Sequence, residues 1–262
     1  MNILEKIVAF KRREVEGRKA RVSVEELEAS PGFSREVFSL KKFLLDPSRT
    51  GIIAEFKRRS PSRGVINDRV RVEDVTKGYA AAGASCLSVL TDEEFFGGTS
   101  DDLRAARVNS IPILRKDFMI DEYQIVEARA IGADVILLIA ACLSPAEVQR
   151  LAGFARSLGL EVLLEIHSEE ELGHICDETP IVGVNNRDLK AFTVDIERSI
   201  RLSKRIPAGK LLVAESGIND TATILHMKKA GFRGFLVGEH FMKEEDPGAA
   251  FTAFVGELTK NI

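Results

Sequence analysis

The chain has 262 residues, and 37 Lys and Arg against 40 Asp and Glu give it a formal net charge of −3. Hydrophobic residues make up 45% and charged residues 29%, a balance that argues against intrinsic disorder. Because there is no basic excess to neutralise a phosphate backbone, we expect no nucleic-acid partner. The length is enough for one large domain, such as an α/β barrel of about 250 residues.

The sequence favours a cytoplasmic protein with no membrane partner. Residues 1–19 are charged throughout and lack the apolar core of a signal peptide. The longest apolar run, residues 135–143, is about half of a membrane span. Cys86, Cys142 and Cys176 are far apart and form no C-x-x-C pair, which is typical of small buried side chains in a reducing compartment. Partner proteins cannot be predicted from these features.

The first 50 residues are predicted to form a helical extension. Residues 3 to about 20 place apolar side chains among charges at near-helical spacing, which indicates an amphipathic helix that packs on the main body. Residues 21–50 are broken by Pro-Gly at 31–32 and Asp-Pro at 46–47. This pattern predicts a connecting arm with short helices.

From residue 51 short apolar runs alternate with segments of helical periodicity. Runs that are apolar nearly throughout are typical of parallel strands buried on both faces. Ser144 and Pro145 predict the start of one intervening helix, and Gly159 predicts its end. The predicted strands are residues 51–57, 85–90, 111–116, 133–139, 160–166, 180–185, 210–215 and 232–238.

Eight such units predict an α/β fold, a (β/α)8 TIM barrel over residues 51–262 that carries residues 1–50 as an N-terminal helical extension within one domain. An open, doubly wound sheet is the alternative. The dinucleotide motif G-x-G-x-x-G is missing after the first strand, and the phosphate loop G-x-x-x-x-G-K-[ST] does not occur. The barrel is therefore the better prediction.

Charged and amide side chains stand where six predicted strands end, and TIM-barrel active sites gather at that edge. Glu55 and Lys57 are two residues apart and so point the same way. A salt bridge would explain any one of these residues, but six strands that bring both signs to one rim favour an acid–base enzyme site. The other residues are Lys116, Asp117, Glu165, Asn185, Asn186, Arg187, Glu215, Ser216, Gly217, Gly238 and Glu239.

Two features of the strand ends indicate an anionic ligand. Ser216, Gly217 and Gly238 put small residues after the seventh and eighth strands, where TIM barrels bind phosphate through backbone N–H groups. The loop at residues 58–71 contains five arginines that, with Lys57, would draw an anionic substrate to the barrel mouth and could close over it. As the alternative, this loop is only a solvated connection.

The motifs AEFKRRSPSRG, SVLTDEEFFGGTSDDL, ILRKDFMIDEYQI, ADVILLIAACL, LLEIHSEEEL, VGVNNRDLKAFTVD, VAESGI and FLVGEHFM resemble those of the indole-3-glycerol phosphate synthase family. They occur in the family's order, one per strand, and the resemblance extends to ILEKIVAFKR near the N-terminus. The pair E-x-K-x-x-S-P and K-D-F is its most specific part. The resemblance implies closure of 1-(2-carboxyphenylamino)-1-deoxyribulose 5-phosphate to indole-3-glycerol phosphate with loss of CO₂ and water, a carboxy-lyase reaction of tryptophan biosynthesis that needs no cofactor.

The resemblance also implies roles for individual residues. Lys116 is the general acid and Glu165 the general base of the later step. Lys57 would hold the substrate carboxylate or phosphate and serve as a second acid. The groups that orient or support the site are Glu55, Asn185, Glu215 and Arg187. The phosphate pocket is formed by Ser60, Ser216, Gly217, Gly238 and Glu239. An apolar wall for the anthranilate ring is formed by Pro61, Phe96, Phe118, Leu137 and Leu189, and ordinary core packing is the alternative for these residues.

The segment after Gly238 departs from the family's usual pattern. A carboxylate beside a phosphate repels it, so Glu239 is expected to contribute only its backbone N–H. His240 is expected to pack near the barrel rim. The four histidines show no metal-ligand spacing such as H-E-x-x-H, and we expect no metal.

Two other functions are weighed. Phosphoribosylanthranilate isomerase is also a phosphosugar barrel, but that family uses a cysteine at the end of strand 1, where this chain has Glu55 and Lys57. The second is a barrel that only binds a phosphorylated ligand. The presence of both Lys116 and Glu165 argues against it.

Overall fold

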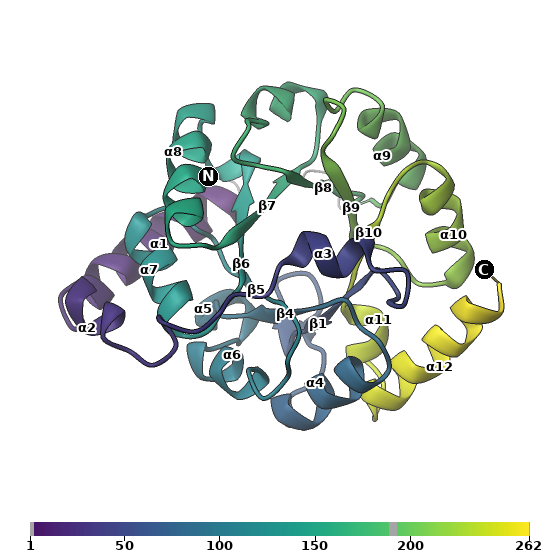
Figure 1. The fold of residues 1–262 in the computed structure, drawn as a ribbon, viewed down its shortest axis with the longest axis horizontal. Helices are drawn as coiled ribbons and strands as arrows, with labels where there is room; N and C mark the ends of the chain where they lie inside the picture. Colours follow the sequence, from purple (N-terminus) through teal and green to yellow (C-terminus); the bar gives the residue numbers. More distant parts are fainter. Residues whose placement is uncertain (1–2, 189–192, 262) are drawn as a thin grey trace.

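A closed barrel of eight parallel strands, surrounded by helices, forms the centre of the molecule (Figure 1). The computed structural model describes residues 3–188 and 193–261. The strands are β1 (Ile52–Phe56), β4 (Cys86–Leu90), β5 (Ile113–Lys116), β6 (Val135–Ile139), β7 (Glu161–Ile166), β8 (Ile181–Asn185), β9 (Leu211–Glu215) and β10 (Gly234–Val237). They lie in the order β1-β10-β9-β8-β7-β6-β5-β4, and β1 closes the ring by pairing with β4. The predicted TIM barrel is confirmed, and each predicted strand contains an observed one.

Successive side chains of each strand point to opposite faces, so the barrel separates two cores. Ile53, Leu114 and Leu163 belong to the inner core, whereas Ile52 and Ala54 pack outward against the helices. Both faces are buried, which explains why the strands are apolar nearly throughout.

The connections after the strands run over the outside of the barrel. Ser144 caps α8 through a capping box, Pro145 is its first residue, and Gly159 follows its end at a φ of 76°, as the sequence predicts. After β7 the connection is the 3-10 helix η2 (Glu169–His174) instead of an α-helix. The outer helices are α4 (Val72–Ala81), α6 (Ser100–Ala106), α7 (Glu122–Ala130), α8 (Pro145–Ser157), α9 (Ile196–Ser203), α10 (Thr221–Lys229) and α12 (Pro247–Lys260), and shorter ones are α5 (Glu93–Phe96), η1 (Ala140–Cys142) and α11 (Glu239–Met242).

The N-terminal helices are placed at opposite ends of the barrel. They are α1 (Ile3–Lys19), α2 (Val24–Glu28) and α3 (Leu40–Leu45), in agreement with the predicted helix and arm. Leu44 of α3 packs beside Gly234 at the start of β10 and belongs to the inner core. Figure 1 shows α3 crossing the barrel in front, while α1 lies further back. The extension therefore seals the amino ends of the strands with α3 and reaches their carboxyl ends with α1.

The segment 58–71 is more ordered than a solvated loop. It contains a hairpin of β2 (Arg59–Ser60) and β3 (Gly64–Val65). Arg58 forms an ion pair with Asp102 of α6, and Arg59 donates to two backbone carbonyls of α5. Two of the five arginines thus anchor the hairpin beside the barrel mouth.

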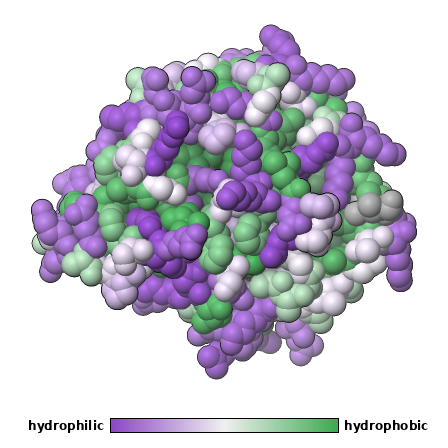
Figure 2. All heavy atoms as spheres, viewed as in Figure 1, coloured by the Kyte–Doolittle hydropathy of each residue, from purple (hydrophilic) through white to green (hydrophobic). Residues whose placement is uncertain are grey.

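The molecular surface viewed from the α3 side is mostly hydrophilic around its outline, with hydrophobic side chains visible between the polar ones toward the centre (Figure 2). No helix in the described part of the chain is long and apolar enough to cross a membrane.

Candidate active site

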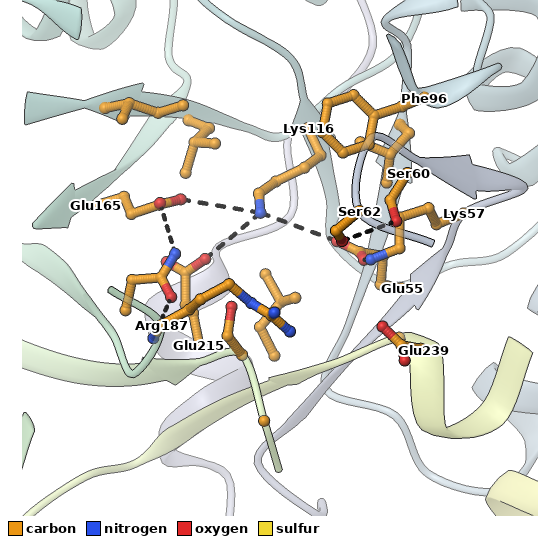
Figure 3. Close-up of a pocket in the computed structure, with 18 of the residues that line it drawn as sticks. Glu55, Lys57, Ser60, Ser62, Phe96, Lys116, Glu165, Arg187, Glu215 and Glu239 are labelled. Atoms are coloured by element: carbon orange, nitrogen blue, oxygen red, sulfur yellow. Dashed lines mark hydrogen bonds and ion pairs between the residues drawn. The ribbon is translucent and has the colours of Figure 1, made fainter. Parts of the chain in front are cut away.

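One pocket lies at the carboxyl ends of the barrel strands (Figure 3). Of the described residues that the sequence places at the site, Asn186 does not line the pocket: its side chain is buried and donates to the backbone carbonyl of Ser216. The others line it, and Leu189 lies outside the described residues. These residues are Glu55, Lys57, Ser60, Pro61, Phe96, Lys116, Phe118, Leu137, Glu165, Asn185, Arg187, Glu215, Ser216, Gly217, Gly238 and Glu239. The barrel topology alone joins them, because they come from positions spread over the chain from the first strand to the last.

Lys116 stands at the centre of the pocket floor and faces three carboxylates (Figure 3). Its Nζ lies 3.5 Å from Glu215 Oε2 and 3.9 Å from both Glu55 Oε2 and Glu165 Oε2. Burial opposes the charged form of the lysine, but the three carboxylates outweigh it and raise the pKa of Lys116. Lys116 is therefore an ammonium group with protons to donate.

Glu165 is held by neighbours on several strands. Its Oε1 accepts a hydrogen bond of 2.8 Å from Asn185 Nδ2, and His167 Nε2 lies 3.0 Å from the same oxygen. Burial alone would raise the pKa of Glu165, but His167, Lys116 and Asn185 together lower it below its ordinary value. Glu165 is thus an ionised carboxylate in a nearly dry site.

Glu215 has the opposite electrostatic character. Burial, followed by the charge of Glu165, raises the pKa of Glu215 to about 8. Its side chain lies over Gly183, where a Cβ atom would come 2.1 Å from Glu215 Oε1. Asn185 is the register partner of Glu215 on the adjacent strand. The site therefore holds two buried glutamates in different protonation states near neutral pH, which is the arrangement that acid–base chemistry requires.

Glu55 and Lys57 form the second cation–carboxylate pair. Lys57 Nζ lies 2.9 Å from Glu55 Oε1, and Ser88 Oγ donates to Glu55 Oε2 at 3.4 Å. Burial opposes ionisation of Glu55, but Lys57 and Lys116 lower its pKa. Gly238 allows this carboxylate to fit, since a Cβ there would meet Glu55 Oε1 at 2.6 Å.

Apolar side chains form one wall of the pocket. The rings of Phe96 and Phe118 lie 6.1 Å apart at an interplanar angle of 39°. Leu137 lies in the wall from β6 and is also part of the inner core. This wall has the size and character to contact a planar apolar group beside Lys116.

The turns after β9 and β10 bring backbone to the opposite side of the pocket. Ser216 and Gly217 have φ values of 67° and 70°, and a Cβ at Gly217 would meet Val194 at 2.4 Å. Ser216 is the described non-glycine residue with a positive φ, a conformation that costs energy and often marks a functional turn. Small residues at both turns leave the backbone accessible from the pocket.

The segment after Gly238 contains two residues for which the sequence makes a prediction, Glu239 and His240. The Glu239 carboxylate lies 3.0 Å from Arg63 Nε of the hairpin, so its charge has a partner away from the turn. His240 packs edge-on against Phe241 and Phe254, and burial followed by Lys243 lowers its pKa. His240 thus packs near the rim, as the sequence predicts, and it also lines the pocket.

Sequence reasoning missed several pocket residues. Ile3, Leu4 and Ile7 of α1 line the pocket, although the sequence predicts only that their helix packs on the main body. His167 also lines it, and its two-residue spacing from Glu165 was the only signal in the sequence. Gly183 makes room for Glu215 but is indistinguishable in sequence from any glycine in a strand.

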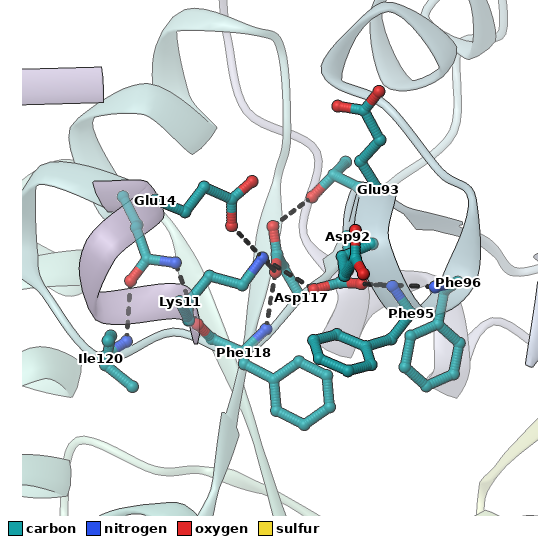
Figure 4. A network of polar contacts seen from close by, with 12 residues as sticks. Lys11, Glu14, Asp92, Glu93, Phe95, Phe96, Asp117, Phe118 and Ile120 are labelled. Atoms are coloured by element: carbon teal, nitrogen blue, oxygen red, sulfur yellow. Dashed lines mark hydrogen bonds and ion pairs between the residues drawn. The ribbon is translucent and has the colours of Figure 1, made fainter. Parts of the chain in front are cut away.

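A buried ionic network ties α1 to the strand ends that carry Lys116 and the aromatic wall (Figure 4). Lys11 Nζ lies 2.8 Å from Asp92 Oδ2 and 2.9 Å from Asp117 Oδ1, and all three side chains are fully buried. Asp92 accepts the backbone N–H groups of Phe95 and Phe96. Asp117 accepts the backbone N–H of Phe118 at 2.8 Å. Lys11 therefore supports both phenylalanines of the wall through two aspartates.

Across residues 3–188 and 193–261, no group of three or more His, Cys, Asp or Glu side chains could hold a metal ion. The pocket presents ammonium, carboxylate and imidazole groups. A TIM barrel with such a cluster at the carboxyl ends of its strands, next to an aromatic wall, defines an acid–base enzyme that acts on a small ligand.

Comparisons with known proteins identify which enzymes this site resembles. The family model described as indole-3-glycerol phosphate synthase matches residues 4–254. A protein of that name from Bacteroides thetaiotaomicron is 49% identical over 255 residues, covering 97% of this chain and 98% of the relative. Another from a Polaromonas species is 44% identical over 260 residues, with coverage of 97% and 98%. The chain therefore belongs to the indole-3-glycerol phosphate synthase family.

More distant solved structures share the fold. A chain of the tryptophan synthase complex from Pyrococcus furiosus superposes with a TM-score of 0.60 at 16% identity, covering 81% of this chain and 99% of that one. A 3-hexulose-6-phosphate synthase gives a TM-score of 0.62 at 14% identity, with coverage of 78% and 98%. At these identities the comparison supports the barrel and nothing finer.

Proposed function

We propose that the protein is a carboxy-lyase that closes 1-(2-carboxyphenylamino)-1-deoxyribulose 5-phosphate to indole-3-glycerol phosphate, with loss of CO₂ and water, in tryptophan biosynthesis. The names of the close relatives support this reaction. The observation that carries it is the position of Lys116 Nζ, 3.5 to 3.9 Å from three buried carboxylates and beside an apolar wall. The alternatives of an isomerase and of a binding-only barrel have no comparable support.

In the first step the ring carbon that bears the carboxylate attacks the ketone carbon of the sugar. Lys116 donates a proton to the ketone oxygen, which becomes a hydroxyl group. The carboxylate then leaves as CO₂ and returns its bonding electrons to the ring, which restores aromaticity. A positioned acid contributes about 10²–10⁴-fold to such a step.

In the second step the new hydroxyl group leaves as water and a proton is lost from the neighbouring carbon. Glu165 is the proposed base, because it is ionised and fixed by Asn185. An acid must protonate the departing hydroxyl, and Lys116 or Lys57 serves this purpose. The elements lost over both steps, CO₂ and water, account for the difference between substrate and product.

The remaining residues are proposed to hold the two ends of the substrate. Arg187, whose side chain points into the cavity in Figure 3, supports the site, and Lys57 holds an anionic group. The phosphate is placed against the turns at Ser216, Gly217 and Gly238, near the amino end of α11, where backbone N–H groups favour anions. The anthranilate ring is placed against the apolar wall.

The test is to incubate the protein with the carboxyphenylamino substrate and follow indole fluorescence. The chain contains no Trp, so the protein adds little to the indole signal. Product formation that requires the protein is expected. Binding of the substrate without any product would contradict the proposed reaction and favour a binding-only barrel.

A further inference from the structure

His167 is a buried imidazole between two carboxylates. Its side chain is 8% exposed and follows β7 on the same side as Glu165, two residues earlier. Its Nε2 lies 3.0 Å from Glu165 Oε1, and its Nδ1 lies 3.4 Å from Glu171 Oε2. Both ring nitrogens thus face a negative oxygen, an arrangement that an imidazolium ion satisfies and a neutral ring does not.

Glu171 is positioned to keep the ring in place. It belongs to η2, the 3-10 helix that replaces an α-helix after β7, and its Oε2 accepts the backbone N–H of His167 at 2.6 Å. The same carboxylate therefore fixes the backbone and faces the ring of His167.

The surroundings of Glu165 make a second cation important. Three carboxylates face Lys116, and repulsion by the charges of Glu165 and Glu55 is one cause that raises the pKa of Glu215. A cation that contacts Glu165 but neither of the other two decides which carboxylate keeps its charge. The groups that contact Glu165 are Lys116 from β5, Asn185 from β8 and His167 itself. Glu55 from β1 and Glu215 from β9 share Lys116 with it. The nearby thiol of Cys142 from η1 is neutral because burial raises its pKa to about 12.

We propose that His167, supported by Glu171, is a positioning residue that keeps Glu165 ionised and oriented as the catalytic base while Glu215 takes the proton. The proposal rests on the proposed function, because it assigns His167 to the base of that reaction. Burial disfavours the imidazolium, yet the adjacent carboxylates of Glu165 and Glu171, 3.0 and 3.4 Å from its ring nitrogens, raise the pKa of His167 to about 10. His167 acts through Glu165 and needs no contact with substrate.

The test is the pH dependence of kcat in His167→Asn. Asparagine keeps a donor for Glu165 but removes the positive charge, so the pKa of Glu165 rises and its base form is lost at higher pH. We expect the acidic limb of the kcat profile to move upward by about one pH unit or more, since a neighbouring charge shifts a carboxylate by about 1–3 units. Activity lost at low pH should return at high pH. A merely structural role would lower kcat by the same factor at every pH.

His226→Asn is the matched control. His226 Nε2 also contacts a glutamate, Glu197 Oε1 at 2.7 Å, but this pair is exposed on the outside of the barrel. The control should keep the wild-type profile. An unshifted acidic limb in His167→Asn would overturn the proposal, whereas a wild-type protein that forms no product would instead overturn the proposed function.

Two further measurements apply if His167→Asn does not fold. Glu171→Gln keeps His167 but removes one of the two carboxylates that raise its pKa, so His167 carries its positive charge over a narrower pH range. The acidic limb should therefore shift in the same direction by a smaller amount. Imidazole ¹⁵N NMR of the wild-type protein, which has four histidines, should show a doubly protonated ring at pH 8. Four neutral rings at that pH would overturn the proposal without any assay of activity.

Discussion

Lys116 is close to three carboxylates without being committed to any one of them. Its contacts of 3.5, 3.9 and 3.9 Å are longer than a normal hydrogen bond between an ammonium and a carboxylate, which is about 2.7–2.9 Å. The carboxylates therefore stabilise the charge of the lysine but leave its protons free to turn toward a substrate oxygen. This is the geometry expected of a general acid.

Lys116→Met tests this role. Methionine keeps the volume and removes the proton, so kcat should fall by about 10²–10⁴-fold while the substrate still binds. Single-turnover kinetics and the fluorescence of the bound anthranilate group separate the two effects. Lys204→Met, at an exposed position after α9, is the control and should keep wild-type kcat. Near-normal turnover of Lys116→Met would remove Lys116 from its role.

Site residues that stand out against their immediate sequence neighbours could be predicted from the sequence. Lys116 and Glu165 interrupt or end apolar runs, and a charge in such a run must be paired or used. His167 and Gly183 were missed for a physical reason. A histidine just past a strand has the same pattern whether it faces water or a carboxylate, and the role of Gly183 exists only because Glu215 of the neighbouring strand leans over it.

At the scale of elements, α1 is coupled to the active site by Lys11. Burial opposes the charge of Lys11, but Asp117, Asp92 and Glu14 raise its pKa, so it is a buried cation with buried anionic partners. Burial would likewise raise the pKa of Asp117, but Lys11 and Arg115 lower it. Removing one charged residue from such a cluster lowers the free energy of unfolding by more than the whole cluster adds to it. The reason is that the remaining charges stay buried without their partner.

Lys11→Met should destabilise the protein by about 3–5 kcal/mol, since Asp92 and Asp117 would remain buried without their lysine. It should also raise KM, because these aspartates hold the backbone of Phe96 and Phe118. Urea unfolding and steady-state kinetics measure the two effects. Lys6→Met, on an exposed position of the same helix, should change stability by less than about 0.5 kcal/mol. Equal stability of the two variants would contradict the coupling.

The elements themselves were largely predictable, whereas their contacts were not. Parallel strands buried on both faces are apolar runs in any sequence, so all eight could be recognised. The helix α1 was predicted from its amphipathic pattern, but Lys11 looked like one of many solvated charges, because its partners Asp92 and Asp117 are remote in sequence. Likewise, the arginines of segment 58–71 were predicted to attract substrate, and the anchoring of Arg58 on Asp102 depends on tertiary structure.

For the molecule as a whole, the buried Glu215 makes one contribution to stability that falls as pH rises through neutrality. Folding places Glu55, Glu165 and Glu215 around one lysine. Burial and the charge of Glu165 then raise the pKa of Glu215 to about 8. In the unfolded chain a glutamate titrates near 4.5. Between these values the folded state binds a proton that the unfolded state has lost, so the free energy of unfolding decreases as pH rises. The contribution of Glu215 to the free energy of unfolding is fully present below about pH 4.5 and decreases as the pH rises from there to 8 and above.

Glu215→Gln should therefore stabilise the protein, and by more at pH 8 than at pH 5. Glutamine resembles the protonated glutamate in shape and cannot ionise, so the pH-dependent loss disappears. One unit of pKa shift corresponds to about 1.4 kcal/mol, and we expect the gain to be larger at pH 8 by at least about 1 kcal/mol. Urea unfolding at both pH values measures it, with exposed Glu245→Gln as a control that should show no such difference. A gain that is equal at pH 5 and pH 8 would mean that Glu215 is ionised in the folded protein, because only a proton held by the native state makes the stabilisation depend on pH.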